Sequence, residues 1–419
     1  SLAASRSQQN NLQARQVALC GIRRAIALRQ MYPADADQWM DNPQGLADQP
    51  VVEDDETGRG WYFTVYAPGR DETLRYGIID EASKINVNTA DEALLEASGL
   101  LSPEQIDCLL DWRDSDEEPR AGGAESAFYL SRSPVGHEAK NAMLLTVEEL
   151  LLVVGFDALT LWGEDANFNG TLEANENDGE ESFPPDNADG QLQRGLISNF
   201  TAVTYEREIN DGGKPRININ GGQQDLDALD DSGLPEDTIE FIRYVRGRGI
   251  RFSHPVMLFE LEYQGRSSGV GAEELPLVLD LLTVNSDGGK SIRPGAVNVN
   301  TASRNILAAL PGVGDELAGK IVETRSSLDS TQKNSAAWLV GEEVLTKEEF
   351  RNLSRSITGR SMQFRVRCVG YHRPSGQFCA LEAIVDIGRG MPRILYLREL
   401  TRCGLPAIPG AAGSTVLGS

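Results

Sequence analysis

Histidine, cysteine and long hydrophobic runs are all scarce in this sequence of 419 residues. The three histidines, His137, His254 and His372, lie far apart, and none belongs to a G-x-S-x-G or H-E-x-x-H motif. No carboxylate pair stands out from the general acidity, so we name no catalytic residue and expect a protein that is not an enzyme. No run of 18 or more apolar residues occurs, so we expect no membrane span within these residues.

Cysteine is too scattered to form a usual zinc site. No C-x-x-C spacing occurs among the five cysteines, which are Cys20, Cys108, Cys368, Cys379 and Cys403. Cys368 and Cys379 flank an expected hairpin turn at residues 374–376. A disulfide between these two cysteines and a pair of free buried thiols both fit this arrangement.

Positive charge is also in short supply. The 39 lysines and arginines face 63 aspartates and glutamates, which gives a net charge of −24. Such a charge repels phosphate backbones and argues against general nucleic-acid binding. It suits a protein that stays soluble or that collects cations. The length allows two or three domains, each with its own core.

Residues 1–32 are expected to form a helix, since Leu12, Leu19, Ile22 and Ile26 recur at helical spacing on one face. This face could pack on the domain behind it. Alternatively, the segment is the lower half of a longer helix whose apolar upper half lies in a membrane, with arginines near the surface. The sequence starts at Ser1 rather than at methionine, so we expect any anchoring segment to lie upstream of it.

Strand patterns occur near both ends of the chain. Residues 61–66 and 74–79 form an expected hairpin around a turn at 68–71, and residues 364–369, 380–387 and 394–397 repeat the pattern. Strands from the two ends can meet in one sheet. We therefore expect an α+β fold, in which a sheet-containing domain built from both termini carries a mostly helical insertion.

An internal repeat organises the middle of the chain. Three tetrads, Ile85–Asn88, Ile217–Asn220 and Val297–Asn300, each alternate an apolar residue with asparagine. Each tetrad precedes two expected helices joined by a glycine turn, and an arginine (Arg113, Arg246 or Arg325) follows the second asparagine by 25, 26 or 25 residues. We assign the asparagines to helix capping and turns rather than to ligand binding.

Two capping boxes are predicted within the first repeat. Thr89 with Glu92 would cap its first helix, and Ser102 with Gln105 would cap its second.

The third repeat, LPGVGDELAGKI from Leu310 to Ile321, resembles a helix-hairpin-helix motif. In DNA-binding members the glycine turn lets backbone N–H groups reach a phosphate. Here Asp315 and Glu316 follow that turn directly. The three repeats carry net charges of −5, −5 and 0, counted over residues 85–113, 217–246 and 297–325. A total of −10 does not supply the counterion release that DNA binding needs, so we expect no nucleic-acid partner.

Residues 165–176, DANFNGTLEANE, match the calcium-loop pattern D-x-[DN]-x-[DN]-G-x5-E without a mismatch. The six predicted ligand residues are Asp165, Asn167, Asn169, Thr171 (through its carbonyl), Glu173 and Glu176. Gly170 takes the sharp turn, and Leu172 is expected to anchor the loop to the core. The competing interpretation is a solvated acidic linker, because residues 164–190 hold nine acids and no lysine or arginine.

The apolar stretch 144–161 predicts a helix entering the loop, whereas 177–185 argues against a helix leaving it. A sensor loop needs both helices, so we expect a structural clamp with a modest calcium affinity, roughly 10⁻⁴–10⁻³ M. Calcium would fold the segment by cancelling repulsion between clustered carboxylates.

Three further segments carry a family resemblance. They are YGIIDEASKINVNTA from Tyr76, PGAVNVNTA from Pro294 and LYLREL from Leu395. Together with the helical hairpins they resemble general secretion pathway protein K, the minor pseudopilin of bacterial type II secretion, over most of residues 1–402. Two features depart from that family's pattern. The hydrophobic membrane half of the N-terminal helix is absent from this sequence, and the insertion carries a third asparagine tetrad and an EF-hand-like loop.

The resemblance implies a pilin-like fold with an inserted α-domain and calcium sites. It also implies assembly with other minor pseudopilins, through Leu12, Leu19, Ile22 and Ile26, at the periplasmic face of the bacterial inner membrane. No small-molecule substrate is expected.

On this basis residues 1–84 hold the helix and first strands, residues 85–360 the inserted region, residues 361–402 the closing strands, and residues 403–419 a flexible tail. Two alternatives stay open: a helix-hairpin-helix protein of DNA binding or uptake, and a calcium-dependent surface module.

Overall fold

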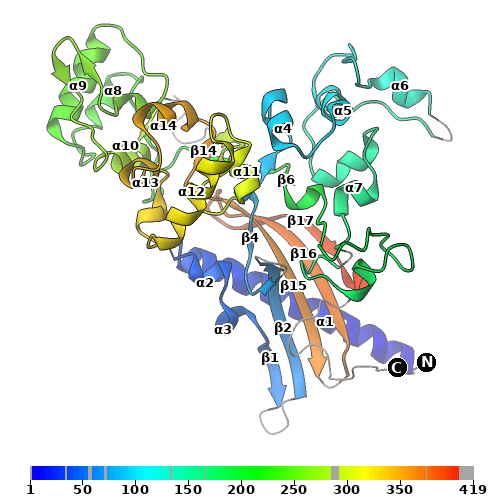
Figure 1. The fold of residues 1–419 in the computed structure, drawn as a ribbon. Coiled ribbons are helices and arrows are strands. Elements are labelled where there is room, and N and C mark those ends of the chain that lie inside the picture. Colours follow the sequence, from blue (N-terminus) through cyan, green and yellow to red (C-terminus); the bar gives the residue numbers. More distant parts are fainter. Residues whose placement is uncertain are drawn as a thin grey trace.

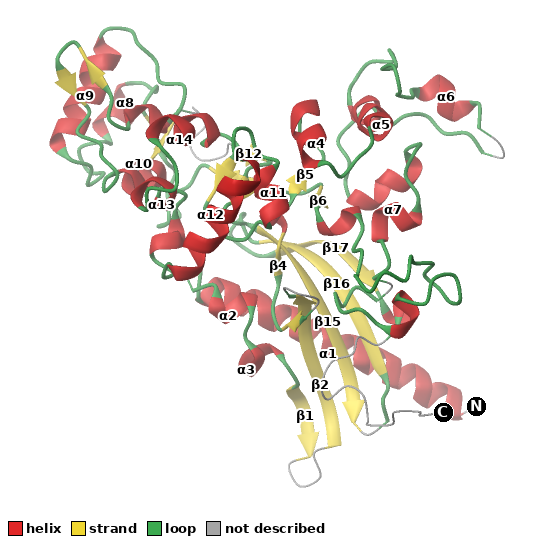
Figure 2. Ribbon diagram, in the orientation of Figure 1, coloured by secondary structure: helices red, strands yellow, loops and turns green. Residues whose placement is uncertain are grey.

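A long helix packed on an antiparallel sheet forms one half of the molecule, and an inserted, mostly helical region forms the other (Figures 1 and 2). The computed structural model describes residues 2–33, 35–54, 59–69, 73–132, 135–165, 167–284, 292–373 and 375–404. The predicted tail lies outside the described residues from position 405 onward, as do parts of the turns predicted at 68–71 and 374–376.

The sheet joins the two ends of the chain, as the strand patterns predict. Its order is β1 (Gln49–Asp54), β2 (Arg59–Pro68), β15 (Gln363–Arg373), β16 (Phe378–Asp386) and β17 (Arg393–Glu399). Neighbouring strands are antiparallel, and β2 pairs with β15 from Gly60 opposite Arg373 to Tyr66 opposite Arg367. The short strands β3 (Leu74–Arg75) and β4 (Ile79–Asp80) pair with β2 and β15, respectively. The expected α+β class is therefore confirmed.

Helix α1 (Leu2–Met31) covers one face of this sheet. Small residues let it come close. A Cβ on Gly370 would lie 2.4 Å from the Ala14 carbonyl oxygen, and a Cβ on Gly21 would lie 2.4 Å from the Cys368 sulfur. No helix in the described part of the chain is both long enough and apolar enough to cross a membrane.

The three repeats form three helical hairpins, as their common pattern predicts. They are α4 (Glu92–Ser98) with α5 (Pro103–Arg113), α8 (Gln223–Asp227) with α9 (Glu236–Gly247), and α11 (Arg304–Ala308) with α12 (Gly314–Ser327). The turn glycines Gly99, Gly233 and Gly312 have φ values of 63°, 80° and 76°, a left-handed conformation that disfavours residues with a Cβ.

Each tetrad begins a short parallel ladder. Strands β5 (Ile85–Asn86), β8 (Ile217–Asn218) and β13 (Val297–Asn298) pair with β6 (Phe200–Thr201), β11 (Leu282–Thr283) and β14 (Ile357–Thr358). Each partner strand is an apolar residue followed by threonine. This closing dipeptide belongs to the repeat, but two-residue strands carry no periodicity that a sequence could reveal.

The inserted region has two hydrophobic cores. The first and third repeats share one core, in which α4 contacts α11, whereas the second repeat builds its own. Figure 1 shows the second repeat as a separate green lobe around α8, α9 and α10 (Leu275–Leu281).

Short elements fill in the rest of both halves. The helices are α2 (Asp37–Met40), α3 (Pro43–Leu46), α6 (Ser126–Leu130), α7 (Ala158–Trp162), α13 (Trp338–Gly341) and α14 (Lys347–Leu353). The strands are β7 (Tyr205–Arg207), β9 (Glu262–Tyr263), β10 (Arg266–Ser267) and β12 (Ile292–Pro294). The 3₁₀ turns are Glu81–Ser83, Val147–Leu152, Ala174–Glu176, Leu196–Ser198, Pro255–Leu258, Gln332–Asn334 and Thr401–Cys403.

Two local predictions are wrong. Helix α4 is capped by Asp91, whose carboxylate accepts the Leu94 N–H at 2.9 Å, so Thr89 is not its N-cap. The single helix expected over residues 144–161 is instead a 3₁₀ turn followed by the five-residue α7. Gly155 separates the two with φ of 87°, which a helix does not accommodate. The predicted capping box of Ser102 and Gln105 is confirmed.

All five cysteines are free.

A chain of buried ion pairs joins the sheet to the inserted region. Arg365 of β15 contacts Glu81 Oε1 at 2.9 Å and Glu382 Oε1 of β16 at 2.8 Å, and these three side chains are at most 1% exposed. Arg367 contacts the other oxygen of Glu382 at 2.7 Å. Burial alone would raise the pKa of Glu81, but the charges of Arg365 and Lys84 hold it at about 2. Arg365 and Arg367 likewise hold the pKa of Glu382 below its usual range against the effect of burial.

We expect Glu382→Gln to lower the free energy of unfolding by about 3–5 kcal/mol, because it removes the carboxylate that pairs with the buried Arg367 and one of the two carboxylates that pair with Arg365. Denaturant titration measures this loss. The matched control is Arg304→Ala, which removes an exposed ion pair with Asp315 and should cost at most about 1 kcal/mol. Equal losses in the two variants would contradict the importance of the buried pair.

The same ion pairs predict how stability depends on pH. The pKa of Glu81 lies below its ordinary value of 4.5 in the folded chain, so its contribution is fully present above that value. We expect this contribution to disappear as the pH falls toward 2. The free energy of unfolding, measured as the pH is lowered, should fall less steeply in Glu81→Gln than in the unaltered protein. Parallel curves for the two proteins would contradict the stabilising role of the Glu81 carboxylate.

Candidate functional site

The first asparagine of each tetrad shapes the backbone that follows it. The side-chain oxygens of Asn86, Asn218 and Asn298 accept the N–H of Asn88, Asn220 and Asn300 at 2.9, 2.9 and 3.0 Å. This turn is the same in all three repeats. It ends the short strand and leads the chain toward the first helix of each hairpin.

The second asparagine fastens the hairpin to a distant segment. Asn88 donates to the Leu144 carbonyl at 2.8 Å and accepts the Leu144 N–H at 2.7 Å, and Asn220 makes the same pair of bonds with Phe252 at 2.7 and 2.9 Å. Asn300 donates to the Lys333 and Gly359 carbonyls and accepts the indole N–H of Trp338. The amides are therefore satisfied inside the protein, where they pair backbone groups that would otherwise be buried alone.

The closing arginines serve the same purpose. Arg113 donates to the carbonyls of Val87 and Ala90, Arg246 to Asn220 at 3.0 Å, and Arg325 to Val299 at 2.8 Å. Each guanidinium thus returns to the tetrad that opens its repeat. The spacing that the three repeats share therefore has a structural role, as predicted. The three guanidinium groups bind backbone carbonyls within the protein.

The turn of the third hairpin is acidic where a phosphate would have to bind. Asp315 forms a two-pronged ion pair with Arg304, with oxygen–nitrogen distances of 2.7 and 2.5 Å. Lys320 donates to the Glu343 carbonyl at 2.8 Å. The basic residues next to the turn are therefore already engaged within the protein.

The predicted calcium loop folds around its first residue. Both carboxylate oxygens of Asp165 accept backbone N–H groups, one from Asn169 and one from Gly170, each at 2.9 Å. The Asn167 and Asn169 amides donate to the two oxygens of Glu173 at 2.9 and 2.8 Å. Gly170 turns the chain with φ of 74°. Four predicted ligand residues are thereby brought together.

The two remaining ligand residues lie less centrally. Glu176 accepts the Glu173 N–H at 3.0 Å, so one of its oxygens is turned toward the loop backbone. Thr171 donates its N–H and its hydroxyl to Asn169 at 2.6 and 2.8 Å. The carboxylates of Asp165, Glu173 and Glu176 do not converge within 4.8 Å of one another. Chelation of one ion by all three would require rotation of these side chains.

The donor set of the loop nevertheless fits a hard cation. Carboxylate and amide oxygens are the ligands that calcium prefers. Asp165 is 3% exposed and Glu176 is 1% exposed. Burial raises the pKa of Asp165 even though Arg367 opposes this effect, and burial also raises the pKa of Glu173. Burial thus disfavours the charged forms of Asp165 and Glu173, which a bound cation would favour.

Phe168, which the sequence did not single out, anchors the loop. Its ring is 6% exposed and packs beneath Arg367 and Arg398, each with its guanidinium carbon 5.1 Å from the ring centre. Arg367 also donates to the Phe168 carbonyl at 2.8 Å. Leu172, the predicted anchor, is only half-buried, so that prediction is wrong. The loop is thus attached directly to the buried ion pairs of the sheet.

The face predicted for partner binding is divided between the interior and the solvent. Ile22 is fully buried against the sheet of its own chain and is not available to a partner helix, so its assignment to the interface is wrong. Leu19 and Ile26 are half-buried at the edge of the same core, whereas Leu12 is 58% exposed. Helix spacing alone does not separate these positions, because the helix rests on a sheet that the local sequence cannot reveal.

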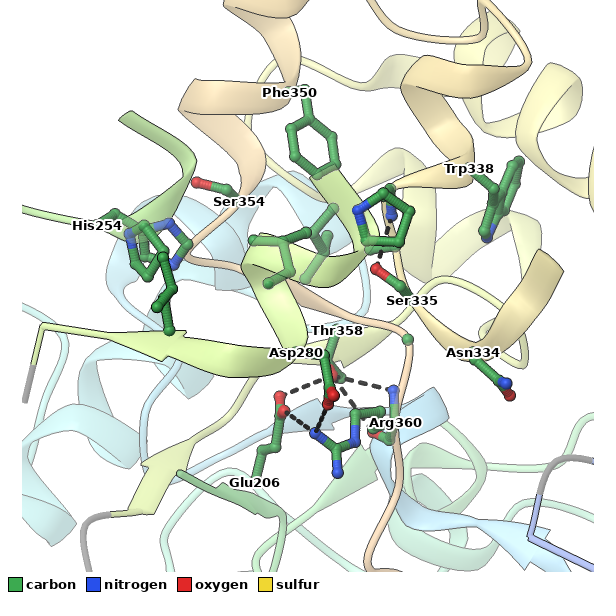
Figure 3. A pocket seen from close by; sticks show the side chains of 18 of the residues that line it. Glu206, His254, Asp280, Asn334, Ser335, Trp338, Phe350, Ser354, Thr358 and Arg360 are labelled. Carbon is green, nitrogen blue, oxygen red and sulfur yellow. Dashed lines mark hydrogen bonds and ion pairs between the residues drawn. The ribbon is translucent and has the colours of Figure 1, made fainter. Parts of the chain in front are cut away.

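A cavity of about 750 Å³ lies between the second and third repeats (Figure 3). At its base Glu206 binds Arg216, Arg293 and Arg360 at 2.9, 2.5 and 3.8 Å. Burial, together with Arg293 and Arg355, lowers the pKa of His254 to about 4.

Two serines of this cavity bind backbone groups. Ser335 accepts the Ala337 N–H, and Ser354 donates to the Arg351 carbonyl. These two contacts stabilise the local backbone.

Comparison with known proteins gives two family matches. Residues 80–161 match the model of the type II secretion system protein K, in the part described as its first domain. This segment of the chain is similar to type II secretion protein K. This protein K domain contains the first repeat and ends in α7. Residues 295–333 match the helix-hairpin-helix motif, which agrees with the third repeat.

One solved structure is similar over 94% of this chain and 99% of its own, with 13% sequence identity and a TM-score of 0.38. It is titled as the crystal structure of the GspK-GspI-GspJ complex from the enterotoxigenic Escherichia coli type 2 secretion system. No curated protein matches the chain.

We expect calcium to raise the melting temperature of the full chain relative to a chelator. At a concentration about ten times Kd the gain is roughly 1.4 kcal/mol. Glu176→Gln should reduce this shift, because it removes a charge from the loop, whereas Glu180→Gln at an exposed position of the same acidic segment should not. Identical transitions with calcium and chelator would contradict a calcium loop.

Proposed function

We propose that this chain is a non-enzymatic minor pseudopilin of a type II secretion system, which caps or initiates the periplasmic pseudopilus for protein export. The match of residues 80–161 to protein K carries this proposal. The architecture supports it, because a long N-terminal helix on an antiparallel sheet is joined to a bulky inserted region (Figure 1). The protein would act at the periplasmic face of the inner membrane.

The helix provides the means of assembly. Residues 8–13 of α1 are exposed and include the large apolar side chain of Leu12, whereas Ala14 is buried. Such a residue can pack against helices of other minor pseudopilins. The inserted region lies across one end of the sheet, where its bulk would prevent another subunit from stacking beyond it (Figure 2).

We expect Leu12→Asp to abolish co-purification with the partner pseudopilins while the monomer keeps its melting temperature, since a charge at an exposed site does not disturb the core. Leu12→Met, which keeps the apolar contact, should retain the complex. Ile22→Asp should instead unfold the monomer, because that side chain is fully buried. A complete complex with Leu12→Asp would exclude this part of the helix from the interface.

The match to the helix-hairpin-helix motif suggests DNA binding as a second candidate function. A gel-shift assay with duplex DNA at low salt distinguishes the two functions. We expect no shift, because the acidic turn and the engaged basic residues offer no phosphate site. Tight, salt-sensitive binding would favour the DNA-binding function over assembly.

A further inference from the structure

The cavity between the second and third repeats lies largely outside the two family matches, which cover residues 80–161 and 295–333. One wall is a face of α10, on which Pro276, Leu279 and Asp280 recur at helical spacing. Another wall is α13 together with the residues that precede it. The matched segments therefore do not account for this cavity.

The size and position of the cavity suit a ligand. Its volume of about 750 Å³ falls within the roughly 300–1,000 Å³ that is usual for ligand sites. It lies between the separate core of the second repeat and the core that contains Trp338, and ligand sites are common at such boundaries. The apolar lining residues include Pro255, Pro276, Leu279, Val284, Ala336 and Trp338. An apolar ligand group would therefore find apolar contacts on both walls.

The charged lining of the cavity contains more acid than base. Three arginines, Arg216, Arg293 and Arg360, meet at Glu206. His254, whose pKa is lowered by burial to about 4, adds no positive charge at neutral pH. Against these three guanidinium groups the described lining holds six carboxylates, those of Glu206, Glu208, Asp211, Glu273, Asp280 and Glu342. This excess of negative charge favours a ligand that carries a positive charge.

Asp280 is an acid that the protein neutralises only in part. Its Oδ1 accepts the Asp211 N–H at 2.8 Å and lies 3.6 Å from Arg360 (Figure 3). Its Oδ2 has no hydrogen-bond or ion-pair partner among the described residues. Burial, followed by the charge of Asp211, raises the pKa of Asp280 although Arg360 and Arg216 oppose this effect. A cation beside Oδ2 would favour the charged form of this carboxyl group.

Asn334 offers a second polar contact close to the wall formed by α13. It is an exposed lining residue, and its side-chain amide has no hydrogen-bond partner in the part of the chain that the structure describes. An amide both donates and accepts hydrogen bonds, which matches the N–H and C=O groups of a peptide backbone. A peptide can therefore use both ends of this amide, whereas an ammonium ion, which only donates, can use its oxygen alone.

We propose that the cavity binds a lysine or arginine side chain from an extended peptide segment of a partner protein. Long basic side chains combine an apolar stem with a cationic end. The stem packs along Leu279 and Trp338, the charged end reaches Asp280, and Asn334 binds the backbone of the same segment. This site is separate from Leu12 on α1, so the second repeat gains a binding function of its own.

The test is binding of the pentapeptide Ala-Leu-Lys-Leu-Ala, with an N-terminal fluorophore and a C-terminal amide, to the full chain, measured by fluorescence anisotropy. We expect saturable binding. A peptide in which norleucine replaces lysine should bind roughly tenfold or more weakly, because it cannot form the charge-assisted hydrogen bond. Asp280→Asn should weaken binding of the lysine peptide by a similar factor and leave the norleucine peptide unaffected. Absence of binding, equal binding of the two peptides, or an equal loss of both in Asp280→Asn would overturn the proposal.

Occupation of the cavity itself is tested by Gly341→Trp. Gly341 lines the cavity, and a Cβ added there meets no atom within 4 Å, so the tryptophan should fill the cavity and abolish binding without unfolding the chain. Gly247→Trp, at the end of α9 and equally unobstructed, is the matched control and should bind as before. Unchanged binding in Gly341→Trp would exclude the cavity as the site.

n-Hexylamine separates the two sources of the cation, because it supplies an ammonium group and an apolar stem without a peptide backbone. We expect it to displace the labelled peptide only at concentrations well above those at which the unlabelled peptide does so. Displacement at equal concentrations would overturn the choice of a peptide as the ligand.

Discussion

The buried guanidinium of Arg365 must be neutralised from two sides, and the carboxylates that do so come from opposite ends of the inserted region. Glu81 precedes this region in the sequence, and Glu382 follows it on the adjacent strand of the sheet. Thr201, which closes the first repeat, donates its hydroxyl to Glu81 at 2.6 Å. Sheet, entry and first repeat are thus bound into one arrangement, since none of these charges can remain buried alone.

Two further buried acids extend the same arrangement to the other repeats. Asp80, beside Glu81, accepts hydrogen bonds from Asn298, Thr301 and Ser361, all from the third repeat or its end. Glu206 accepts the hydroxyl of Thr358 at 2.8 Å and binds the arginines that hold the second repeat in place. The buried acids Asp80, Glu81 and Glu206 therefore help to position the three repeats relative to the sheet. Helical hairpins of a type known from nucleic-acid-binding proteins thus serve here as structural units.

Much of this architecture could be predicted because its signals are local or repeated. Alternation of apolar and polar residues predicts the long strands, and the recurring asparagine tetrads predict the hairpins. The burial of Ile22 could not be predicted, because it depends on a sheet whose central strand, β15, lies more than 300 residues away. The approach of Glu125 to Asp111 could not be predicted for a similar reason, because it depends on the path of the loop between α5 and α6.

The predicted calcium loop contacts the same buried charges, so an ion bound in it would affect more than the loop itself. Arg367 has its guanidinium shared between Glu382 on one side and the carbonyl and ring of Phe168 on the other. The loop also rests on β2, because a Cβ on Gly170 would lie 2.5 Å from Pro68. Unfolding of the loop would therefore remove the contacts of Arg367 with Phe168. It would also admit water to the ion pair between Arg367 and Glu382, which is stable only when it is dry and fully hydrogen-bonded. Because the loop contacts Arg367 of the sheet through Phe168, a cation that stabilised the loop would also stabilise the attachment of the inserted region to the sheet.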